Sequence, residues 1–412
     1  MTAEVLYLSF DGMTDPLGRS QVLPYMTGLA ALGHRIRIVS LEKADAYDRD
    51  AWAVDEICRE AGLEWHPLPY RTRPPIVSTL LNLRALRRAA ERLLRQRPAD
   101  FSHCRSDLPG IVGLKLKRRL GLPLLYDMRA FWPDERAEGG QWDQSKWLYR
   151  WMFRYFKKRQ RELLTEADEV VTLSDAGRRA VLDMGVRDAG LPITVIPCCA
   201  DFGLFAPLTA DRRAAARAEL GIGGAAPLLV HVGSIGSNCL LGEMLDFFAL
   251  YRERHPEAQF LFVAPAGEQI IRAGASKRGV EGAVHVRSAG REEVPRWIGA
   301  ADLGIMFVRP VWSKKAASPT KLGEMLAAGL PVVANSGVGD VAEIVRETCA
   351  GVVVDQFDAD AYRAAIEALN GMHSSAEEIR TAGRRWFDLA MGIERYDAIY
   401  RRLAGKKERR IA

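Results

Sequence analysis

The sequence predicts an α/β protein with two doubly wound, Rossmann-like parallel sheets that face each other across a cleft. Its 412 residues are more than one domain usually holds and suit two. Short runs rich in β-branched residues and leucine alternate with longer helical patterns, which is typical of parallel sheets with helices on both faces. This rhythm starts again after a linker at Pro197–Pro207. Because ligands of such sheets bind beyond the carboxyl ends of the strands, we expect a cleft between two facing sets of strand ends.

Seven strands are expected in the first half of the chain and six in the second. Those of the first half are Val5–Ser9, Arg35–Leu41, Leu63–His66, Phe101–His103, Leu124–Asp127, Glu169–Leu173 and Ile193–Ile196. Those of the second half are Leu228–Val232, Gln259–Val263, Val284–Val286, Leu303–Phe307, Pro331–Ala334 and Gly351–Val354. Helical patterns include Ser20–Leu32, Ser78–Gln96, Gln144–Thr165 and the basic Arg384–Lys407. We expect domains at 1–200 and 201–385, and a terminal helix at 386–412 for which packing back on the first domain is one option.

Composition excludes several classes of protein. Apolar residues make up 48% of the chain and charged residues 27%, so the chain is neither disordered nor rich in membrane spans. No stretch approaches the roughly 18 uncharged apolar residues that a bilayer helix needs, and the start lacks a signal-peptide pattern. We therefore expect a cytoplasmic protein. The six cysteines form no CxxC pair and no cluster with histidine, so buried free thiols and no metal site are expected.

The positive charge is unevenly distributed. Residues 1–200 hold 31 basic and 26 acidic side chains, whereas residues 201–412 hold 27 and 26. A basic excess confined to the first half suggests that this half meets an anionic surface. No recognised nucleic-acid motif accompanies the excess, so we expect no nucleic-acid partner.

The segment 144–161 carries much of that excess, with seven basic residues and no acidic one. At 100° per residue, most of the basic side chains fall on one arc of a helix, and Leu148, Trp151, Met152, Tyr155 and Phe156 fall on the opposite one. A basic amphipathic helix with aromatic residues suits an anionic bilayer surface. The alternative is an ordinary surface helix that docks its aromatic face on the sheet. The first interpretation predicts peripheral association with the inner face of the cell membrane.

The most informative stretch for chemistry is Ala317–Ala334. Ser318 is expected to be the N-cap of a helix and Pro319 its first residue. Free backbone N–H groups at 318–321, the helix dipole and the charge of Lys321 then form an anion site that suits phosphate. Glu324 follows about 4.5 Å further along the helix axis, where a carboxylate can accept both ribose hydroxyls of a nucleotide. The alternative is a well-capped connection with a solvated glutamate.

This stretch resembles the donor-site signature of retaining GT-B glycosyltransferases, specifically glycosyltransferase family four. Asp15–Tyr25 is similar to the family's loop after the first strand, and Asp127–Arg136 is similar to a block in members that serve surface-polysaccharide gene clusters. Ile196–Asp201 stands where the family places its interdomain linker, and Val232–Gly236 opens the donor domain. The resemblance extends over nearly the whole chain.

The resemblance implies a hexosyltransferase that moves a sugar from a UDP- or GDP-sugar to a lipid-linked or saccharide acceptor in surface polysaccharide biosynthesis. It implies retention of configuration, no metal and no further cofactor. The first domain would bind the acceptor and the second the donor. The residues implied for the donor are Gly233, Ser234, Arg309, Lys314, Ser318, Pro319, Thr320, Lys321 and Glu324. Those for the acceptor are Gly18, Arg19, Ser20, His103, Arg129, Asp134 and Glu135, and those for catalysis are Asp127, Arg129 and Lys321.

The sequence departs from the family pattern at three places. The first of the two motif glutamates, eight residues before Glu324, is replaced by Ala316. The segment 233–243 holds none of the basic residues that commonly clamp the diphosphate, so we assign that part to Lys321 and Arg309, with either Lys314 or Lys315 as a further source of positive charge. Arg129 stands where many relatives have a histidine. Because its side chain is always charged, it cannot act as a base, but it can bind a phosphate group.

Two other functions stay open at this point. One is a nucleotide-sugar epimerase on the same two-domain fold, and the other is a non-catalytic relative that binds a nucleotide-sugar, which the alanine at position 316 favours. Asp127, Asp134 and their neighbouring arginines are also explained by structural ion pairs, and His103 by a place in the core. The sequence leaves open the base, the sugar, the linkage, the acceptor and the oligomeric state.

Overall fold

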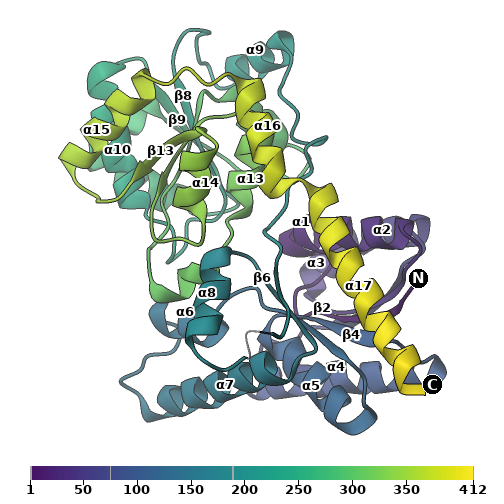
Figure 1. The fold of residues 1–412 in the computed structure, drawn as a ribbon. Coiled ribbons are helices and arrows are strands. Elements are labelled where there is room, and N and C mark those ends of the chain that lie inside the picture. Colours follow the sequence, from purple (N-terminus) through teal and green to yellow (C-terminus); the bar gives the residue numbers. More distant parts are fainter. Residues whose placement is uncertain (1, 75, 188–189, 412) are drawn as a thin grey trace. The chain divides into compact units, whose positions relative to one another are not determined.

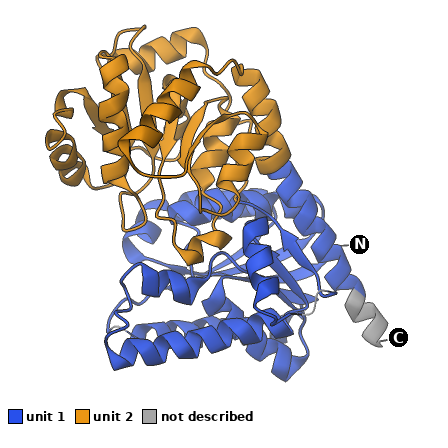
Figure 2. Cartoon of the chain, turned by 60° about the vertical axis from the view of Figure 1, so that its left-hand side comes forward, with its two compact units in different colours: residues 1–197, 389–412 blue, residues 198–388 orange. Residues whose placement is uncertain are grey.

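The computed structural model describes residues 2–74, 76–187 and 190–411, with the side chains of 406–411 left out. The chain divides into two compact units (Figure 2). Unit 1 comprises Met1–Pro197 and Leu389–Ala412, and unit 2 comprises Cys198–Asp388. Each unit holds one parallel sheet (Figure 1).

The sheet of unit 1 has seven strands in the order β3-β2-β1-β4-β5-β6-β7. Leu8 at the end of β1 pairs with Val39 of β2 on one side and with Cys104 of β4 on the other. The strands are β1 (Glu4–Leu8), β2 (Arg35–Glu42), β3 (Glu64–Pro69), β4 (Phe101–Arg105), β5 (Leu124–Asp127), β6 (Glu169–Thr172) and β7 (Ile193–Val195). All seven expected strands are present, each within a few residues of its expected range.

Helices alternate with these strands as parallel pairing requires. In Figure 1, α4, α5 and α7 lie on one side of the sheet, and α1, α2 and the C-terminal helix α17 lie on the other. The helices of unit 1 are α1 (Pro16–Gln21), α2 (Leu23–Ala31), α3 (Ala44–Glu60), α4 (Val77–Gln96), α5 (Asp107–Leu120), α6 (Trp132–Glu138), α7 (Trp147–Glu166), α8 (Asp175–Asp183) and α17 (Leu389–Ile411).

Unit 2 repeats the plan with six strands in the order β10-β9-β8-β11-β12-β13. The strands are β8 (Leu228–Val232), β9 (Gln259–Val263), β10 (Val284–Arg287), β11 (Leu303–Met306), β12 (Val332–Asn335) and β13 (Gly351–Val354). The helices are α9 (Ala210–Glu219), α10 (Leu241–Arg254), α11 (Glu268–Ser276), η1 (Glu281–Ala283), α12 (Val294–Ala300), η2 (Trp312–Ala316), α13 (Thr320–Ala327), α14 (Val341–Glu347), α15 (Ala359–Asn370) and α16 (Ala376–Phe387). The two doubly wound α/β sheets that the sequence predicts are confirmed.

Strand order places a ligand-binding edge in each unit. In both sheets the order reverses beside the first strand, between β1 and β4 in unit 1 and between β8 and β11 in unit 2. Loops that leave the carboxyl ends of two such strands turn to opposite faces of the sheet, which opens a crevice between them. Residues that follow these strands are therefore the first place to look for a site.

Two helices differ from expectation. The helix expected at Ser20–Leu32 is broken at Val22, because Pro24 has no N–H to donate and its ring crowds the carbonyl four residues earlier. The helical pattern at Arg384–Lys407 is likewise two helices, since Asp388 between α16 and α17 has an extended backbone with φ −63° and ψ 128°.

The helix α17 packs in unit 1 against α2. His34 lies 2.7 Å from the carboxylate of Asp397, and Arg402 donates to the buried Glu169 at 3.1 Å. The ring of Tyr400 is buried beside Phe101. Within the described residues, no helix combines the length and the apolar content that crossing a bilayer requires.

Candidate active site

In unit 2 the chain turns sharply as it leaves β8 beside the reversal point. Gly233 follows the strand with φ +115°, a conformation that favours glycine, and its N–H donates to the carbonyl of Val263 at 2.9 Å. A Cβ atom at this position would lie 3.2 Å from Nζ of Lys321. The amine of Lys321, carried by α13, therefore lies directly against the turn that ends β8.

The amine of Lys321 is hydrogen-bonded to His231 of β8. Its Nδ1 lies 3.0 Å from the carbonyl oxygen of Ile305, which can only accept, so Nδ1 carries the proton. Nε2 then has a lone pair, and Nζ of Lys321 donates to it at 3.3 Å. Burial, with the neighbouring charge of Lys321, lowers the pKa of His231 well below its ordinary value. The imidazole is a neutral acceptor.

Burial also acts on the lysine itself and lowers the pKa of Lys321 to about 8. At pH 7 the amine is still mostly protonated, so it presents a poorly hydrated positive charge at the turn after β8. The thiol of Cys239 lies 3.8 Å from Nε2 of His231, and burial raises its pKa, which keeps it uncharged.

Glu324 stands on α13 three residues after Lys321 and is buried. Its carboxylate lies 3.8 Å from a guanidinium nitrogen of Arg291, in the segment between β10 and α12. Burial raises the pKa of Glu324, although the charges of Arg291 and Lys321 oppose that rise. The carboxylate of Glu324 therefore lies under the influence of two positive charges, those of Arg291 and Lys321.

The start of α13 differs from expectation in one respect. The helix begins at Thr320, and its N-cap is Pro319 with an extended backbone, so the expected cap at Ser318 and first turn at Pro319 are both wrong by one position. The hydroxyl of Ser318 instead accepts from the backbone N–H of Cys198 at 3.1 Å. Proline has no hydrogen-bonding side chain, so no side chain caps the first turn.

The remaining donor-side residues follow β8 and β11 at the same sheet edge. Ser234 comes directly after Gly233, and the N–H of Arg309 donates to the carbonyl of Asn238 at 2.9 Å. Lys314 is buried in η2, and its carbonyl accepts from Gly339 at 2.8 Å. Ala316, where the family pattern has a glutamate, is fully buried at the end of η2, so a longer side chain would have to displace its neighbours.

In unit 1 the end of β5 carries a buried network of charges. Asp127 lies 3.3 Å from Arg129, 3.6 Å from His103 and 3.9 Å from Arg105, the last residue of β4. Arg105 also donates to Asp11 at 2.9 Å. Burial acts to raise the pKa of Asp127, but the charges of Arg129 and Arg105, together with the contact to His103, outweigh it and hold the pKa well below the ordinary range. The carboxylate therefore stays ionised at any physiological pH.

His103 lies in the core of unit 1. Its Nδ1 lies 2.8 Å from the hydroxyl of Tyr400, and its ring packs against Tyr7 and Tyr396. Burial lowers its pKa, so the ring is neutral at pH 7 despite the nearby Asp127.

The other acceptor-side residues lie on α1 and α6. Gly18 packs so closely on the preceding loop that a Cβ atom would lie 2.0 Å from the carbonyl oxygen of Gly12; Arg19 and Ser20 follow it half-buried. Asp134 pairs with Lys157 of α7 at 2.7 Å, and Glu135 follows it in the first turn of α6. The structure thus brings Asp127, Arg129 and His103 into direct contact, and places Asp134 in a separate ion pair.

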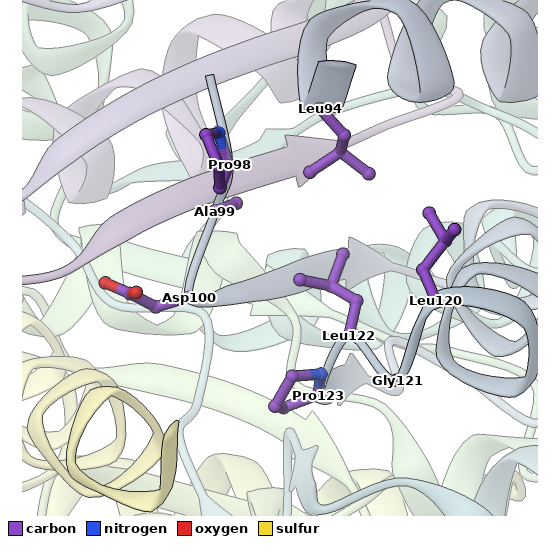
Figure 3. A pocket seen from close by; sticks show the side chains of 8 residues that line it. All are labelled: Leu94, Pro98, Ala99, Asp100, Leu120, Gly121, Leu122 and Pro123. Atoms are coloured by element: carbon purple, nitrogen blue, oxygen red, sulfur yellow. The ribbon is translucent and has the colours of Figure 1, made fainter. Parts of the chain in front are cut away.

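One hollow of unit 1 lies away from these residues. A cavity of about 260 Å³ is lined mainly by apolar side chains around Leu94, Leu120 and Leu122 (Figure 3). Pro98 and Pro123 on its wall precede β4 and β5, so the cavity lies at the amino ends of the strands. It is at the opposite edge of the sheet from Asp127 and Arg105.

Sequence reasoning missed His231 and Arg291. His231 is an internal residue of an apolar strand, and its pairing with Lys321 joins positions 90 residues apart. Arg291 could have been found by position, because it follows β10 and the carboxyl ends of parallel strands share one edge. Within the described residues, no group of three or more histidine, cysteine or acidic side chains is arranged to hold a metal ion.

Two domain families match the chain in sequence. Residues 19–199 match the glycosyl transferase 4-like domain, and residues 226–370 match the glycosyl transferases group 1 domain. A D-inositol 3-phosphate glycosyltransferase from Segniliparus rotundus is 27% identical over 287 residues, which cover 67% of this chain and 59% of that protein. The chain thus spans about 60% of the length of the curated relatives it matches first.

Solved structures with the same fold cover almost the whole chain. Sucrose-phosphate synthase from Thermosynechococcus elongatus is similar with a TM-score of 0.76 and 18% identity, over 98% of this chain and 99% of that one. Alr3699/HepE from Anabaena, solved in complex with UDP and glucose, is similar with a TM-score of 0.70 and 16% identity, over 96% and 99%. The chain thus has the two Rossmann-like sheets of the GT-B fold, and it matches two glycosyltransferase domain families in this order.

Proposed function

We propose that this protein transfers a hexose from a UDP- or GDP-sugar to a lipid-linked or saccharide acceptor, with retention of configuration and without a metal. The main support for a donor site in unit 2 is the position of Lys321. Its amine lies against the turn after β8, and Glu324 follows three residues later on the same helix. The turn itself holds no basic residue between 233 and 243. Lys321 supplies from α13 the cation that this turn lacks.

In this proposal the diphosphate binds at the start of α13, where no side chain caps the helix. Backbone N–H groups and the amine of Lys321 take up the negative charge that grows on the leaving diphosphate. Glu324 accepts from the ribose hydroxyls, and Arg291 orients that carboxylate and offsets part of the rise in its pKa. The departing diphosphate assists in removing the proton of the acceptor hydroxyl.

On the acceptor side, Arg129 is the charged group that suits a phosphate of the acceptor or leaving group, and Asp127 holds it in place. Asp127 is already engaged with Arg129, His103 and Arg105, so we assign it the positioning of Arg129 rather than proton transfer.

We further propose that α7 brings unit 1 to an anionic membrane surface, where a lipid-linked acceptor would be found. The apolar arc of α7 is divided: Met152 and Phe156 are buried, whereas Trp151 is 57% exposed. Trp147, the first residue of the helix, is 72% exposed. The ring of Trp151 stacks on that of Tyr155. Exposed aromatic rings beside arginine and lysine side chains suit the headgroup region of a bilayer. Such a location agrees with a role in surface polysaccharide biosynthesis.

The direct test is turnover with a panel of UDP- and GDP-hexoses, followed by NMR of the anomeric configuration of the product. Acceptors in the panel are polyprenyl-phosphate-linked sugars, free disaccharides and inositol 3-phosphate, the compound in the name of the curated relatives. Transfer with retention from one donor class supports the proposal. Conversion of the donor without an acceptor would establish an epimerase instead. Binding without any turnover would establish a non-catalytic relative, which the buried alanine at position 316 favours.

A further inference from the structure

We propose that a hollow at the carboxyl ends of β2 and β3 in unit 1 binds a neutral sugar ring of the acceptor. This inference rests on the proposed transferase function and names a place and a chemical class for its acceptor. The hollow has a volume of about 350 Å³ and is lined by Glu42, Tyr47, Asp48, Pro67, Leu68 and Tyr70, among others. Small-molecule sites start at about 300 Å³, so one or two sugar rings fit.

The hollow lies at the functional edge of the sheet. All seven strands of unit 1 are parallel, so the ends of β2 and β3 lie at the same edge as Arg105 and Asp127, which end β4 and β5. Ligands of doubly wound sheets bind at this edge.

The floor of the hollow is rigid. The carboxylate of Glu42 accepts from the N–H groups of Met13 and Thr14 at 2.8 and 3.2 Å, from the hydroxyl of Thr14 at 2.6 Å, and from the hydroxyl of Ser40. The carbonyl of Glu42 accepts from the N–H of Tyr70 at 2.8 Å. Glu42 is buried, and its carboxylate oxygens already accept these hydrogen bonds, so the side chain fixes the loop after β1. Hydrogen bonds to a sugar would therefore come from the residues at the rim.

The walls are also held in place. The side chain of Asn82 on α4 forms two hydrogen bonds with the backbone of Arg71. Its Oδ1 accepts from the N–H of Arg71 at 3.1 Å and its Nδ2 donates to the carbonyl of Arg71 at 2.9 Å, which fixes the segment that follows Tyr70. The ring of Tyr47 packs against Trp65 with centroids 5.9 Å apart, and the Trp65 indole donates to Ser40 at 2.8 Å. A hollow with fixed walls loses little entropy when a ligand binds.

The side chains around the hollow suit a sugar. A pyranose ring offers an apolar face of C–H groups and a rim of hydroxyls, and the two tyrosine rings with Pro67 and Leu68 provide an apolar surface. The hydroxyls of Tyr47 and Tyr70 and the carboxylate of Asp48 have no hydrogen-bond or ion-pair partner among the described residues. They remain available to bond sugar hydroxyls.

The charges select against an anion. Glu42 and Asp48 line the hollow, and the nearby Lys43 is paired with Asp15 at 3.0 Å. A phosphate or a uronic acid would therefore meet repulsion here, whereas a neutral hexose or N-acetylhexosamine would not. Phosphate groups of the acceptor are left to Arg129.

The test is saturation-transfer NMR with methyl glycosides of glucose, galactose, mannose and N-acetylglucosamine as probes. At least one glycoside should receive saturation on its ring protons from the intact chain. Tyr47→Ala and Tyr70→Ala should each weaken that binding about two- to tenfold, as expected for the loss of one aromatic contact. Tyr149→Ala, a half-buried tyrosine on α7, is the matched control and should leave it unchanged.

Two conservative variants separate a loss of sugar binding from a loss of folding. Tyr47→Phe keeps the ring and should retain most of the signal, and Asp48→Asn changes a side chain that is exposed. Absence of binding for all four glycosides, or binding that neither alanine variant changes, would overturn the proposal. Titration of the same variants with UDP and GDP reports separately on the donor site, which should bind its nucleotide with unchanged affinity.

Discussion

Nζ of Lys321 lies 3.3 Å from Nε2 of His231, and the proton on the opposite ring nitrogen is fixed by the carbonyl of Ile305. Lys321 of α13 thus places a positive charge at the turn after β8, where the segment 233–243 has no basic residue. The arrangement places a positive charge with low hydration at the strand-order reversal of unit 2, which is where the proposed function requires a cation for the leaving diphosphate.

The pH dependence of transfer should report on Lys321. Its pKa is about 8, and only the protonated amine stabilises a leaving diphosphate, so kcat/KM should fall as the pH rises through about 8. Lys321→Arg keeps the charge to high pH and should move that fall upward, while Lys321→Ala should reduce kcat/KM roughly 100-fold or more at pH 7. Rates measured from pH 6 to 10 decide this. An unchanged profile in Lys321→Arg would show that another group titrates.

Lys321 should also lower the stability of the folded chain at neutral pH. The folded pKa lies below the ordinary lysine value of 10.5, so between about pH 8 and 10.5 the unfolded chain binds the extra proton and stability rises with pH. Lys321→Met should therefore be more stable than the parent at pH 7, by on the order of 3 kcal/mol in the free energy of unfolding, and should unfold at a higher temperature; this difference should shrink by pH 10.

The matched control for that comparison is Lys277→Met, an exposed lysine in the same unit, which should change the melting temperature little at either pH. If Lys321→Met were less stable than the parent at pH 7, the hydrogen bond to His231 would outweigh the burial of the charge.

Glu324 should act in nucleotide binding. Glu324→Gln keeps the size of the side chain but loses the charge that faces Arg291, so UDP or GDP should bind about 10- to 100-fold more weakly. Titration calorimetry with the nucleotide alone measures this without any acceptor. Glu347→Gln, an exposed glutamate on α14, is the control. Equal affinity in Glu324→Gln and Glu347→Gln would remove Glu324 from the site.

The exposed tryptophans of α7 should bind lipid. Replacing both Trp147 and Trp151 by alanine should release the protein from vesicles of phosphatidylglycerol and phosphatidylcholine in a sedimentation assay, because aromatic area at the headgroup level is lost. Trp52→Ala removes a tryptophan that is 69% exposed on α3, outside the basic segment 144–161, and should sediment like the parent. Equal binding to vesicles of pure phosphatidylcholine would argue against an anionic surface.

Local patterns were sufficient to predict the fold. Strands such as Leu228–Val232 and Leu303–Met306 are mainly apolar runs that are buried along their whole length, and they are recognisable because a parallel sheet covered by helices needs such runs. Breaks inside a helical pattern are harder to place, and Pro24 moved the start of α2 in a way that the surrounding periodicity did not indicate.

The contacts between individual side chains of the site could not be predicted from spacing in the sequence, because they join residues that are far apart along the chain. Lys321 and Glu324 stand in a motif with a readable start and end, so their positions on one helix could be predicted. The use of Ser318 to bond Cys198 comes from a partner 120 residues away. The pairings of His231 and Arg291 likewise join different strands and loops, and they follow only once the strand order is known.

The most direct test of the central claim is a crystal structure of the protein with UDP and with GDP. We expect one of the two nucleotides to bind with its diphosphate within hydrogen-bond distance of Nζ of Lys321 and of the N–H groups at 320–321, and with its ribose hydroxyls on the carboxylate of Glu324. A nucleotide bound in unit 1, or in unit 2 without contact to either side chain, would contradict the account.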